Sequence, residues 1–423
     1  MITPSPAAEA PCHLPRLVCF VNDIYDQSMA GGDVYFYFTA SAAIQAGHPV
    51  HFFGGHALKD YLERWKLPKN HTITDSGPGK LGDFSTLPGQ FRLFWDFTRR
   101  FWGTLRRLKE VKPDDLAYVL SDYWFDAIPL TLCRAKAKIL YVGMMAPTLM
   151  EVLFKRRADV TSIRLPAFYF WLSQQLSLRW FRHCQNGFVT YGHPEIRDYL
   201  LKFGYQPSQL WPALNGSNAE TADQVPTQPK QFDVVWVGRV HPQKGIDDLL
   251  ETFVWIRKQL PDFKALIIGN AKKKLEPVVQ AMGLADCVTF SGMVSETDKF
   301  RLLKSSRLFL MPSHYESWGI VVGEALVSGV PVLAYKLDCY PAVFGQAVRY
   351  VTPFDREAFK QAAEDEIRRQ RAGQNYLQAL DWTALKNRLS WSATQKDFCH
   401  LLSHIVQLDT RKNATSKPAQ TSE

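Results

Sequence analysis

The stretch FLMPSHYESWGIVVGEAL, residues 309–326, decides how the rest of the chain is interpreted. Its apolar start predicts a strand that ends near Met311, and after a polar loop the pattern predicts a helix from near Ser317 to Gly329. The backbone N–H groups of residues 318–320 would then be unpaired donors at a helix N-terminus, which favours a phosphate or sugar oxygen. The stretch therefore predicts a strand, a ligand-binding loop and a helix.

Two glutamates flank this loop. Glu316 lies within it and Glu324 lies two turns into the predicted helix, so both carboxylates could accept hydrogen bonds from ligand hydroxyls. Gly319 between them would allow a close approach of the ligand to the backbone. For such a pair in isolation, the alternative is a solvated helix residue at Glu324 and a plain N-cap at Ser317.

A second loop upstream carries two cations. Val237-Gly238-Arg239 ends a predicted strand, and Lys244 follows five residues after Arg239, before a helix predicted over Ile246–Leu260. Ligands of open α/β sheets bind at the carboxyl ends of the strands, where Arg and Lys together would neutralise a diphosphate. Two ordinary surface cations are the alternative, which is weakened because cations are disfavoured near a helix N-terminus.

Short apolar runs alternate with helical patterns along the whole chain, which predicts parallel sheets built from βαβ units. A polar, proline-flanked stretch over 212–230 separates two such series and is interpreted as a linker. The predicted strands are Leu17–Val21, Pro49–Phe53, Leu116–Leu120, Lys138–Val142, Gly187–Thr190, Phe232–Val237, Lys264–Ile268, Cys287–Phe290, Leu308–Met311 and Pro331–Ala334.

Composition excludes several classes of protein. The chain has 423 residues, which suits two domains of about 200 residues each, and its apolar fraction of 46% is that of a globular protein. No apolar run reaches the roughly 18 residues of a membrane helix. Its seven cysteines form no C-x-x-C pair, which favours reduced thiols in the cytoplasm over a disulfide scaffold or a zinc ribbon.

Taken together, the motifs resemble those of the family 4 retaining glycosyltransferases. The shared signatures are G-R-x4-K-G over Gly238–Gly245, S-x-x-E-S-W-G over Ser313–Gly319, and E-A-L-x-S-G-x-P-V over Glu324–Val332. The resemblance implies the GT-B fold, an α/β architecture of two Rossmann-like domains that face each other across a cleft. The predicted organisation is a disordered start (1–15), an acceptor-side domain (16–211), the linker (212–230), a nucleotide-sugar domain (231–396), a terminal helix that packs back on the first domain (397–408) and a disordered tail (409–423).

The resemblance also implies roles for individual residues. Arg239 and Lys244 would bind the donor diphosphate, Glu316 would hold the transferred sugar, and Glu324 would bind the ribose hydroxyls. Growing charge on the leaving diphosphate could then be stabilised by cations and a helix dipole without metal, so neither a metal nor another cofactor is expected. The remaining donor-binding residues implied by the resemblance are Gly31, Gly32, Gly238, Met293, Val294, Ser317, Trp318, Gly319 and Ile320.

The chain departs from the family pattern on the acceptor side. Many members place a His or an acid after the strand that corresponds to Lys138–Val142, whereas this chain has Gly143-Met144-Met145-Ala146-Pro147. Asp122 is the nearest acidic candidate for a catalytic group, and it could equally cap a helix.

The predicted function is retaining transfer of a sugar from a nucleoside diphosphate sugar to a glycan, a glycolipid or a lipid-linked acceptor, in polysaccharide or glycoconjugate biosynthesis. Two alternatives share the fold: an inactive nucleotide-sugar sensor or scaffold, and a nucleotide-sugar epimerase. A pI of about 9.1 also raises a nucleic-acid binder, but no nucleic-acid motif accompanies the basic segments.

The net charge of +9 is concentrated in two segments of the first domain. Gln90–Lys112 carries seven Lys/Arg against two acids, and Glu151–His183 carries six against two. Within 91–108, Phe94, Phe101, Leu105 and Leu108 recur at helical spacing beside Phe97, Trp102, Arg92, Arg99, Arg100, Arg106 and Arg107. We expect these residues, with 155–182, to dock on an anionic membrane surface, which would place a cytoplasmic protein peripherally on the inner face; the alternative is a helix whose apolar side covers the sheet.

Overall fold

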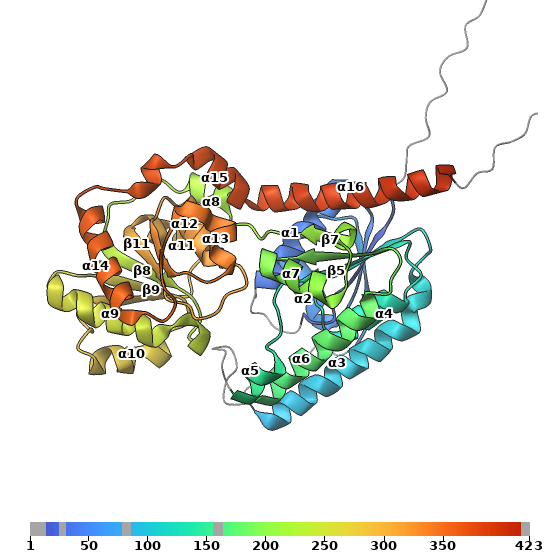
Figure 1. Cartoon of the computed structure of the whole chain (residues 1–423), viewed down its shortest axis with the longest axis horizontal. Coiled ribbons are helices and arrows are strands. Elements are labelled where there is room, and N and C mark those ends of the chain that lie inside the picture. The colour runs from blue at the N-terminus through green and yellow to red at the C-terminus, as the bar shows by residue number, and fades with distance from the viewer. Residues whose placement is uncertain (1–13, 25–30, 78–85, 155–163, 416–423) are drawn as a thin grey trace, which may run out of the picture. The chain divides into compact units, whose positions relative to one another are not determined.

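The computed structural model describes residues 14–24, 31–77, 86–154 and 164–415, and these form two sheets surrounded by helices (Figure 1). The first sheet has seven strands in the order β3-β2-β1-β4-β5-β6-β7, and the second has six in the order β10-β9-β8-β11-β12-β13. All neighbouring strands of the second sheet run parallel, as do the pairs among β1 to β5 of the first. The prediction of two βαβ series is confirmed.

The strands of the first sheet are β1 (Leu17–Phe20), β2 (Val50–Gly54), β3 (His71–Asp75), β4 (Leu116–Val119), β5 (Ala137–Val142), β6 (Gly187–Tyr191) and β7 (Leu210–Pro212). Those of the second are β8 (Phe232–Val237), β9 (Ala265–Ile268), β10 (Val288–Gly292), β11 (Ser306–Met311), β12 (Val332–Tyr335) and β13 (Val348–Val351). The helices before β8 are α1 (Gly31–Gln45), α2 (His56–Arg64), α3 (Leu87–Arg107), α4 (Trp124–Leu132), α5 (Leu149–Phe154), α6 (Arg164–Phe181), α7 (Pro194–Phe203) and α8 (Ala219–Gln224). Those after β8 are α9 (Ile246–Gln259), α10 (Lys272–Ala281), α11 (Glu296–Lys304), α12 (Ile320–Val327), α13 (Cys339–Phe344), α14 (Arg356–Arg371), α15 (Trp382–Leu389) and α16 (Trp391–Thr415).

The second sheet is buried on both faces, which explains why its strands are almost continuously apolar. Along β8, Val234 and Trp236 pack in one core cluster with α9, α10 and α14, whereas Val235 packs in another cluster with α12 and α13. The alternation of side chains along a strand thus divides one apolar run between two cores.

Three strands were not predicted, and all three lie at sheet edges. They are β3 and β7 in the first sheet and β13 in the second. The sequence of β3, HTITD, has one apolar residue and is largely exposed. Strand β13 carries Arg349, and β7 has only three residues. An edge strand contacts fewer neighbours, so its sequence carries a weaker apolar signal.

The segment predicted as a linker contains structure. Strand β7 ends at Pro212, and α8 begins after Asn218, whose side chain accepts a hydrogen bond from the Thr221 N–H. The expected terminal helix over 397–408 is part of the longer α16, which continues to Thr415 into the stretch expected to be a disordered tail.

The chain divides into two compact units that differ from the predicted domains. The first contains the described parts of Met1–Tyr141, Ser173–Thr190 and Phe398–Glu423, and the second contains those of Val142–Leu172 and Tyr191–Asp397. Among the residues that the structure describes, no helix is both long enough and apolar enough to cross a bilayer.

Candidate functional site

The two loops singled out from the sequence lie next to each other in the second unit. Strands β8 and β11 are hydrogen-bonded neighbours, with Val234 opposite Leu308 and Val235 opposite Phe309. The chain order reverses between these two strands, so their carboxyl ends form the switch point at which open α/β sheets bind ligands. The loops that follow β8 and β11 therefore share one ligand-binding edge.

The loop after β8 is shaped by Gly245. A short 3₁₀ turn over Pro242–Lys244 leads to Gly245, whose φ of +61° is unfavourable for other residues. A Cβ atom at this position would lie 1.9 Å from the carbonyl oxygen of Pro312. Glycine is thus required both by its own backbone conformation and by the contact between the two loops.

The loop after β11 ends at Gly319, in a left-handed conformation with φ of +87°. Because Gly319 is the N-cap, α12 begins at Ile320, three residues later than the predicted start near Ser317. The Gly319 carbonyl accepts hydrogen bonds from the N–H groups of Val322 and Gly323. Within the described chain, no acceptor is present for the N–H groups of residues 318–320, so these donors remain available to a ligand.

Lys244 and Glu316 form an ion pair between the two loops. Lys244 Nζ donates to Glu316 Oε1 at 2.5 Å, and Ser313 Oγ donates to the same oxygen at 2.9 Å. The Lys244 side chain is 16% exposed and that of Glu316 is 8% exposed. Arg239 is exposed and, among the described residues, has no ion-pair partner, so the structure brings Lys244 and Glu316 together and leaves Arg239 in solvent.

Glu324 has a partner that the sequence did not indicate. Lys299 Nζ, from α11, donates to Glu324 Oε1 at 2.6 Å, and Glu324 is buried. No local pattern links a lysine in one helix to a glutamate 25 residues later. Nearby in sequence, Met293 is 78% exposed and Val294 is half-buried after β10.

A buried carboxylate, Asp248, lies behind the two loops. It accepts hydrogen bonds from Tyr335 OH at 2.8 Å and from His314 Nε2 at 2.9 Å, both at Oδ2, and Arg356 Nε lies 2.8 Å from Oδ1. Burial alone would raise the pKa of Asp248, but these hydrogen bonds and the charge of Arg356 outweigh burial and lower that pKa. Sequence reasoning missed Asp248, because its partners come from three distant segments.

The structure also describes the surroundings of three other predicted residues of the second unit. Trp318 is buried with its ring against Phe344, so of Trp318 only the backbone can face a ligand. A Cβ atom at Gly238 would lie 2.8 Å from the Trp236 ring, which explains the glycine at the end of β8. Ser317 is half-buried in the loop before α12.

Three further predicted residues, Gly31, Gly32 and Asp122, belong to the first unit. Gly31 and Gly32 are the first residues of α1. Asp122 follows β4 and does not cap α4, whose N-cap is Tyr123. Burial raises the pKa of the Asp122 carboxyl to about 7, although Gln174 Nε2 donates to it at 2.5 Å. Asp122 is thus a buried carboxyl with a satisfied partner.

Helix α3 exposes a different face from the one that its sequence predicted to be exposed. Leu93, Phe97 and Phe101 are buried in a cluster with Phe125, whereas Phe94 is 47% exposed. Arg100, expected among the surface cations, is fully buried and donates to the carbonyl oxygens of Asn22 and Ile24 at 2.6 and 2.8 Å. The exposed face carries Arg92, Trp95, Arg99, Trp102 and Arg106. Of the second segment predicted to dock, 155–182, residues 155–163 with Lys155–Arg157 fall outside the described residues, and nearly all of the rest forms α6.

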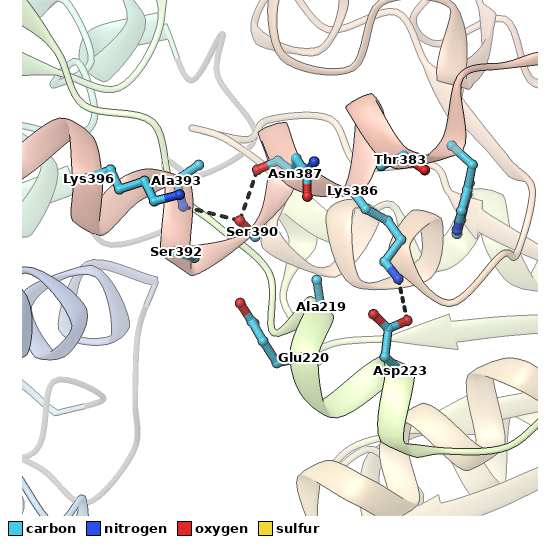
Figure 2. A pocket seen from close by; sticks show the side chains of 11 residues that line it. Ala219, Glu220, Asp223, Thr383, Lys386, Asn387, Ser390, Ser392, Ala393 and Lys396 are labelled. Atoms are coloured by element: carbon cyan, nitrogen blue, oxygen red, sulfur yellow. Dashed lines mark hydrogen bonds and ion pairs between the residues drawn. The ribbon is translucent and has the colours of Figure 1, made fainter.

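A groove of about 570 Å³ lies elsewhere in the second unit, between α8, α15 and the start of α16 (Figure 2). Figure 2 shows Lys386 reaching across it to pair with Asp223. None of the predicted donor-binding residues lines this groove. The groove is therefore distinct from the predicted donor site at the loops after β8 and β11.

Residues 217–378 match the family model described as glycosyl transferases group 1. This range contains both loops, Asp248, Lys299 and Glu324. This part of the chain therefore has the sequence of a group 1 glycosyltransferase, and the resemblance predicted from the motifs is confirmed.

Particular relatives support this assignment. The chain is 24% identical over 281 residues to mannosylfructose-phosphate synthase of Agrobacterium fabrum, with 59% of this chain and 61% of that protein aligned. It is 28% identical over 188 residues to phosphatidyl-myo-inositol mannosyltransferase of Mycobacterium leprae, with 42% and 50% aligned. The match thus spans about three fifths and half of the length of these relatives.

Solved structures share the fold over nearly the whole chain. Sucrose-phosphate synthase from Thermosynechococcus elongatus superposes with a TM-score of 0.70 at 15% identity, covering 93% of this chain and 100% of that one. Anabaena HepE in complex with UDP and glucose gives a TM-score of 0.65 at 16% identity, covering 92% and 100%. The fold is therefore GT-B, as predicted.

Proposed function

We propose that the protein is a retaining glycosyltransferase that moves a sugar from a nucleoside diphosphate sugar to a glycan, glycolipid or lipid-linked acceptor. The observation that carries the proposal is the contact between Lys244 and Glu316 at the shared edge of β8 and β11. In this contact a lysine ammonium, which suits a diphosphate, lies beside a carboxylate, which suits sugar hydroxyls, and the N–H groups before α12 have no acceptor within the described chain. That combination fits a sugar joined to a diphosphate.

The proposed reaction assigns a task to each part of the site. The bond between the sugar C1 and the diphosphate oxygen breaks, and a bond from the acceptor oxygen to C1 forms on the same face; the acceptor proton leaves on the diphosphate. Negative charge grows on the diphosphate, so Lys244, Arg239 and the N–H groups before α12 would stabilise the transition state more than the bound donor. Because these groups supply the positive charge, we propose that no metal is needed.

A donor panel tests the proposal. Purified protein is incubated with UDP-, GDP- and ADP-sugars with and without EDTA, and nucleoside diphosphate release is measured with candidate acceptors. Transfer that survives EDTA and produces the donor's anomer by NMR is expected. A nucleotide sugar that is bound but never transferred or hydrolysed would favour the sensor, and conversion of one nucleotide sugar into its epimer would favour the epimerase.

We also propose that the acceptor is reached at an anionic membrane surface, through the exposed face of α3. Arg92, Trp95, Arg99, Trp102 and Arg106 follow one another at spacings of three and four residues, so they lie on one face of the helix. Trp95 is 61% exposed and Trp102 is 54% exposed. Tryptophan favours the bilayer interface, and each arginine near anionic lipid adds about 1 kcal/mol.

Sedimentation with vesicles tests this docking. Binding to phosphatidylglycerol vesicles is expected at low salt, with little binding to phosphatidylcholine vesicles, and Trp95→Ala/Trp102→Ala should weaken it. Phe354→Ala is the matched control, since Phe354 is an equally exposed aromatic residue (61%) in the second unit. Equal binding to both vesicle types would make the face of α3 an ordinary solvated surface and favour a soluble acceptor.

A further inference from the structure

The loop after β8 (238–245) and the loop after β11 (312–319), here called the two donor loops, are held together by contacts of several kinds. The His314 N–H donates to the Gln243 carbonyl oxygen at 2.7 Å, and Lys244 pairs with Glu316. Behind these contacts, His314 Nε2 lies 2.9 Å from Asp248 Oδ2. Each of these three contacts joins the segment after β8 to the segment after β11.

Asp248 is positioned to hold both loops in place, because it follows the first loop closely in sequence and contacts His314 of the second. It lies in the first turn of α9, four residues after Lys244, and His314 lies two residues before Glu316. Asp248 is only 2% exposed, and Tyr335 and Arg356 hold its carboxylate from β12 and α14. A buried carboxylate with partners on this many elements has little freedom to move.

We infer that Asp248 is a positioning residue for sugar transfer: through His314 it sets the distance between Lys244, which faces the diphosphate, and Glu316, which faces the sugar. This inference rests on the proposed function of the site, but the fixing of the loops can be measured without it. Asp248 itself touches neither proposed ligand-binding side chain.

The inference separates binding from turnover. Without the Asp248 carboxylate, Arg239 and Lys244 still offer two cations to a diphosphate, so the Asp248→Asn variant should retain nucleotide affinity within about threefold. Glu316 would no longer be held at a fixed distance from Lys244, and misplacement of about 1 Å can lower a rate about 100-fold. We therefore expect kcat to fall by about 10- to 100-fold while KM for the donor changes little.

The chain offers a matched control near the start of β8, at the end of that strand opposite to the loop that precedes α9. Asp233, near the start of β8, is also a buried aspartate, and Arg371 NH2 lies 2.7 Å from its Oδ2. Asp233→Asn should cost stability as Asp248→Asn does, because both remove a buried charge from its arginine partner. Only Asp248→Asn should affect turnover when both variants are assayed below their melting temperatures.

Two measurements test the inference. Hydrogen exchange of the full chain is compared for wild type, Asp248→Asn, Asp233→Asn and His314→Ala; amides over 312–319 should exchange at least about tenfold faster in Asp248→Asn and His314→Ala only. Turnover of the donor found in the panel is then measured for the same variants and for Asp248→Asn/His314→Ala. The double variant should be no slower than the worse single variant, because one contact is removed twice.

The outcomes distinguish this inference from the proposed function. Unchanged exchange over 312–319 in Asp248→Asn overturns the positioning role, whatever the activity. Faster exchange over 312–319 in Asp233→Asn as well overturns it too, since the effect would then be general destabilisation. If the wild type transfers no sugar but Asp248→Asn and His314→Ala, and not Asp233→Asn, release the loop, the proposed function fails while the fixing of the two loops by Asp248 stands.

Discussion

Replacing Lys244 with alanine is expected to lower both stability and turnover, through two separable effects. The Lys244 and Glu316 side chains are 16% and 8% exposed and 2.5 Å apart. Loss of the lysine leaves the Glu316 carboxylate with Ser313 Oγ as its remaining described hydrogen-bond donor. Leaving a largely buried charged group short of a partner costs about 2 kcal/mol, and a unit of this size loses about 2–4 °C in Tm for each kcal/mol. The expected loss is therefore about 4–8 °C.

A double-mutant cycle separates stability from catalysis. In the Lys244→Ala/Glu316→Gln variant no charge is left unpaired, so most of the lost Tm should return in a thermal-shift assay. Turnover should not return, because the diphosphate still lacks its cation; kcat/KM should remain at least about 10-fold below wild type, from a charge-assisted contact of about 1.5–3 kcal/mol. Recovery of turnover in the double variant, or wild-type turnover in Lys244→Ala, would refute the phosphate assignment.

Three further changes have defined outcomes. Glu324→Gln should weaken donor binding in calorimetry more than it lowers kcat, and the same loss in Lys299→Ala would show that the pair acts as a unit. Asp122→Asn should flatten the pH dependence of stability: burial raises the folded pKa of Asp122 to about 7, so its unfavourable contribution grows as pH rises from about 4 to about 7. Urea unfolding at pH 5 and pH 8 checks this, with a clearly larger gain expected at pH 8 than at pH 5. Arg100→Met should lower stability by about 3 kcal/mol without affecting vesicle binding, whereas Arg99→Ala should weaken vesicle binding without affecting stability.

The central strands of both sheets could be predicted because their signal is local. A strand buried on both faces, such as β8 or β11, is an apolar run of four to eight residues, and glycine or proline marks its end. Gly238 after β8 and Pro312 after β11 therefore allowed the start of both loops to be predicted from the sequence. At an edge, the same rule fails for β3, because only one neighbouring strand covers it.

The contacts within the site could not be predicted in the same way. Asp248 and His314 are 66 residues apart, and their pairing depends on β8 and β11 being neighbours in the sheet. Neighbouring parallel strands are joined by long crossover connections. Residues that meet where two such strands end are therefore always far apart in the sequence. The sequence identified Lys244 and Glu316 by their types and positions, but their contact with each other follows only from the register of the strands.

Helix α3 illustrates a different limit, because both of its faces contain aromatic residues and arginines. From amphipathic spacing alone, either Phe101 or Trp102 could be the buried aromatic residue, and either Arg99 or Arg100 could be the exposed cation. The core settles the matter: Phe101 fills the space beside Phe125, and Arg100 satisfies two carbonyl groups in the loop after β1. An arginine that is fully buried must have such partners. Only the arginines of α3 that the fold leaves exposed could therefore contact a membrane. The exposed row from Arg92 to Arg106 thus consists of side chains that the core does not bury. Trp95 in this row is 61% exposed, and Trp102 is 54% exposed although its ring meets that of Phe101 edge to face.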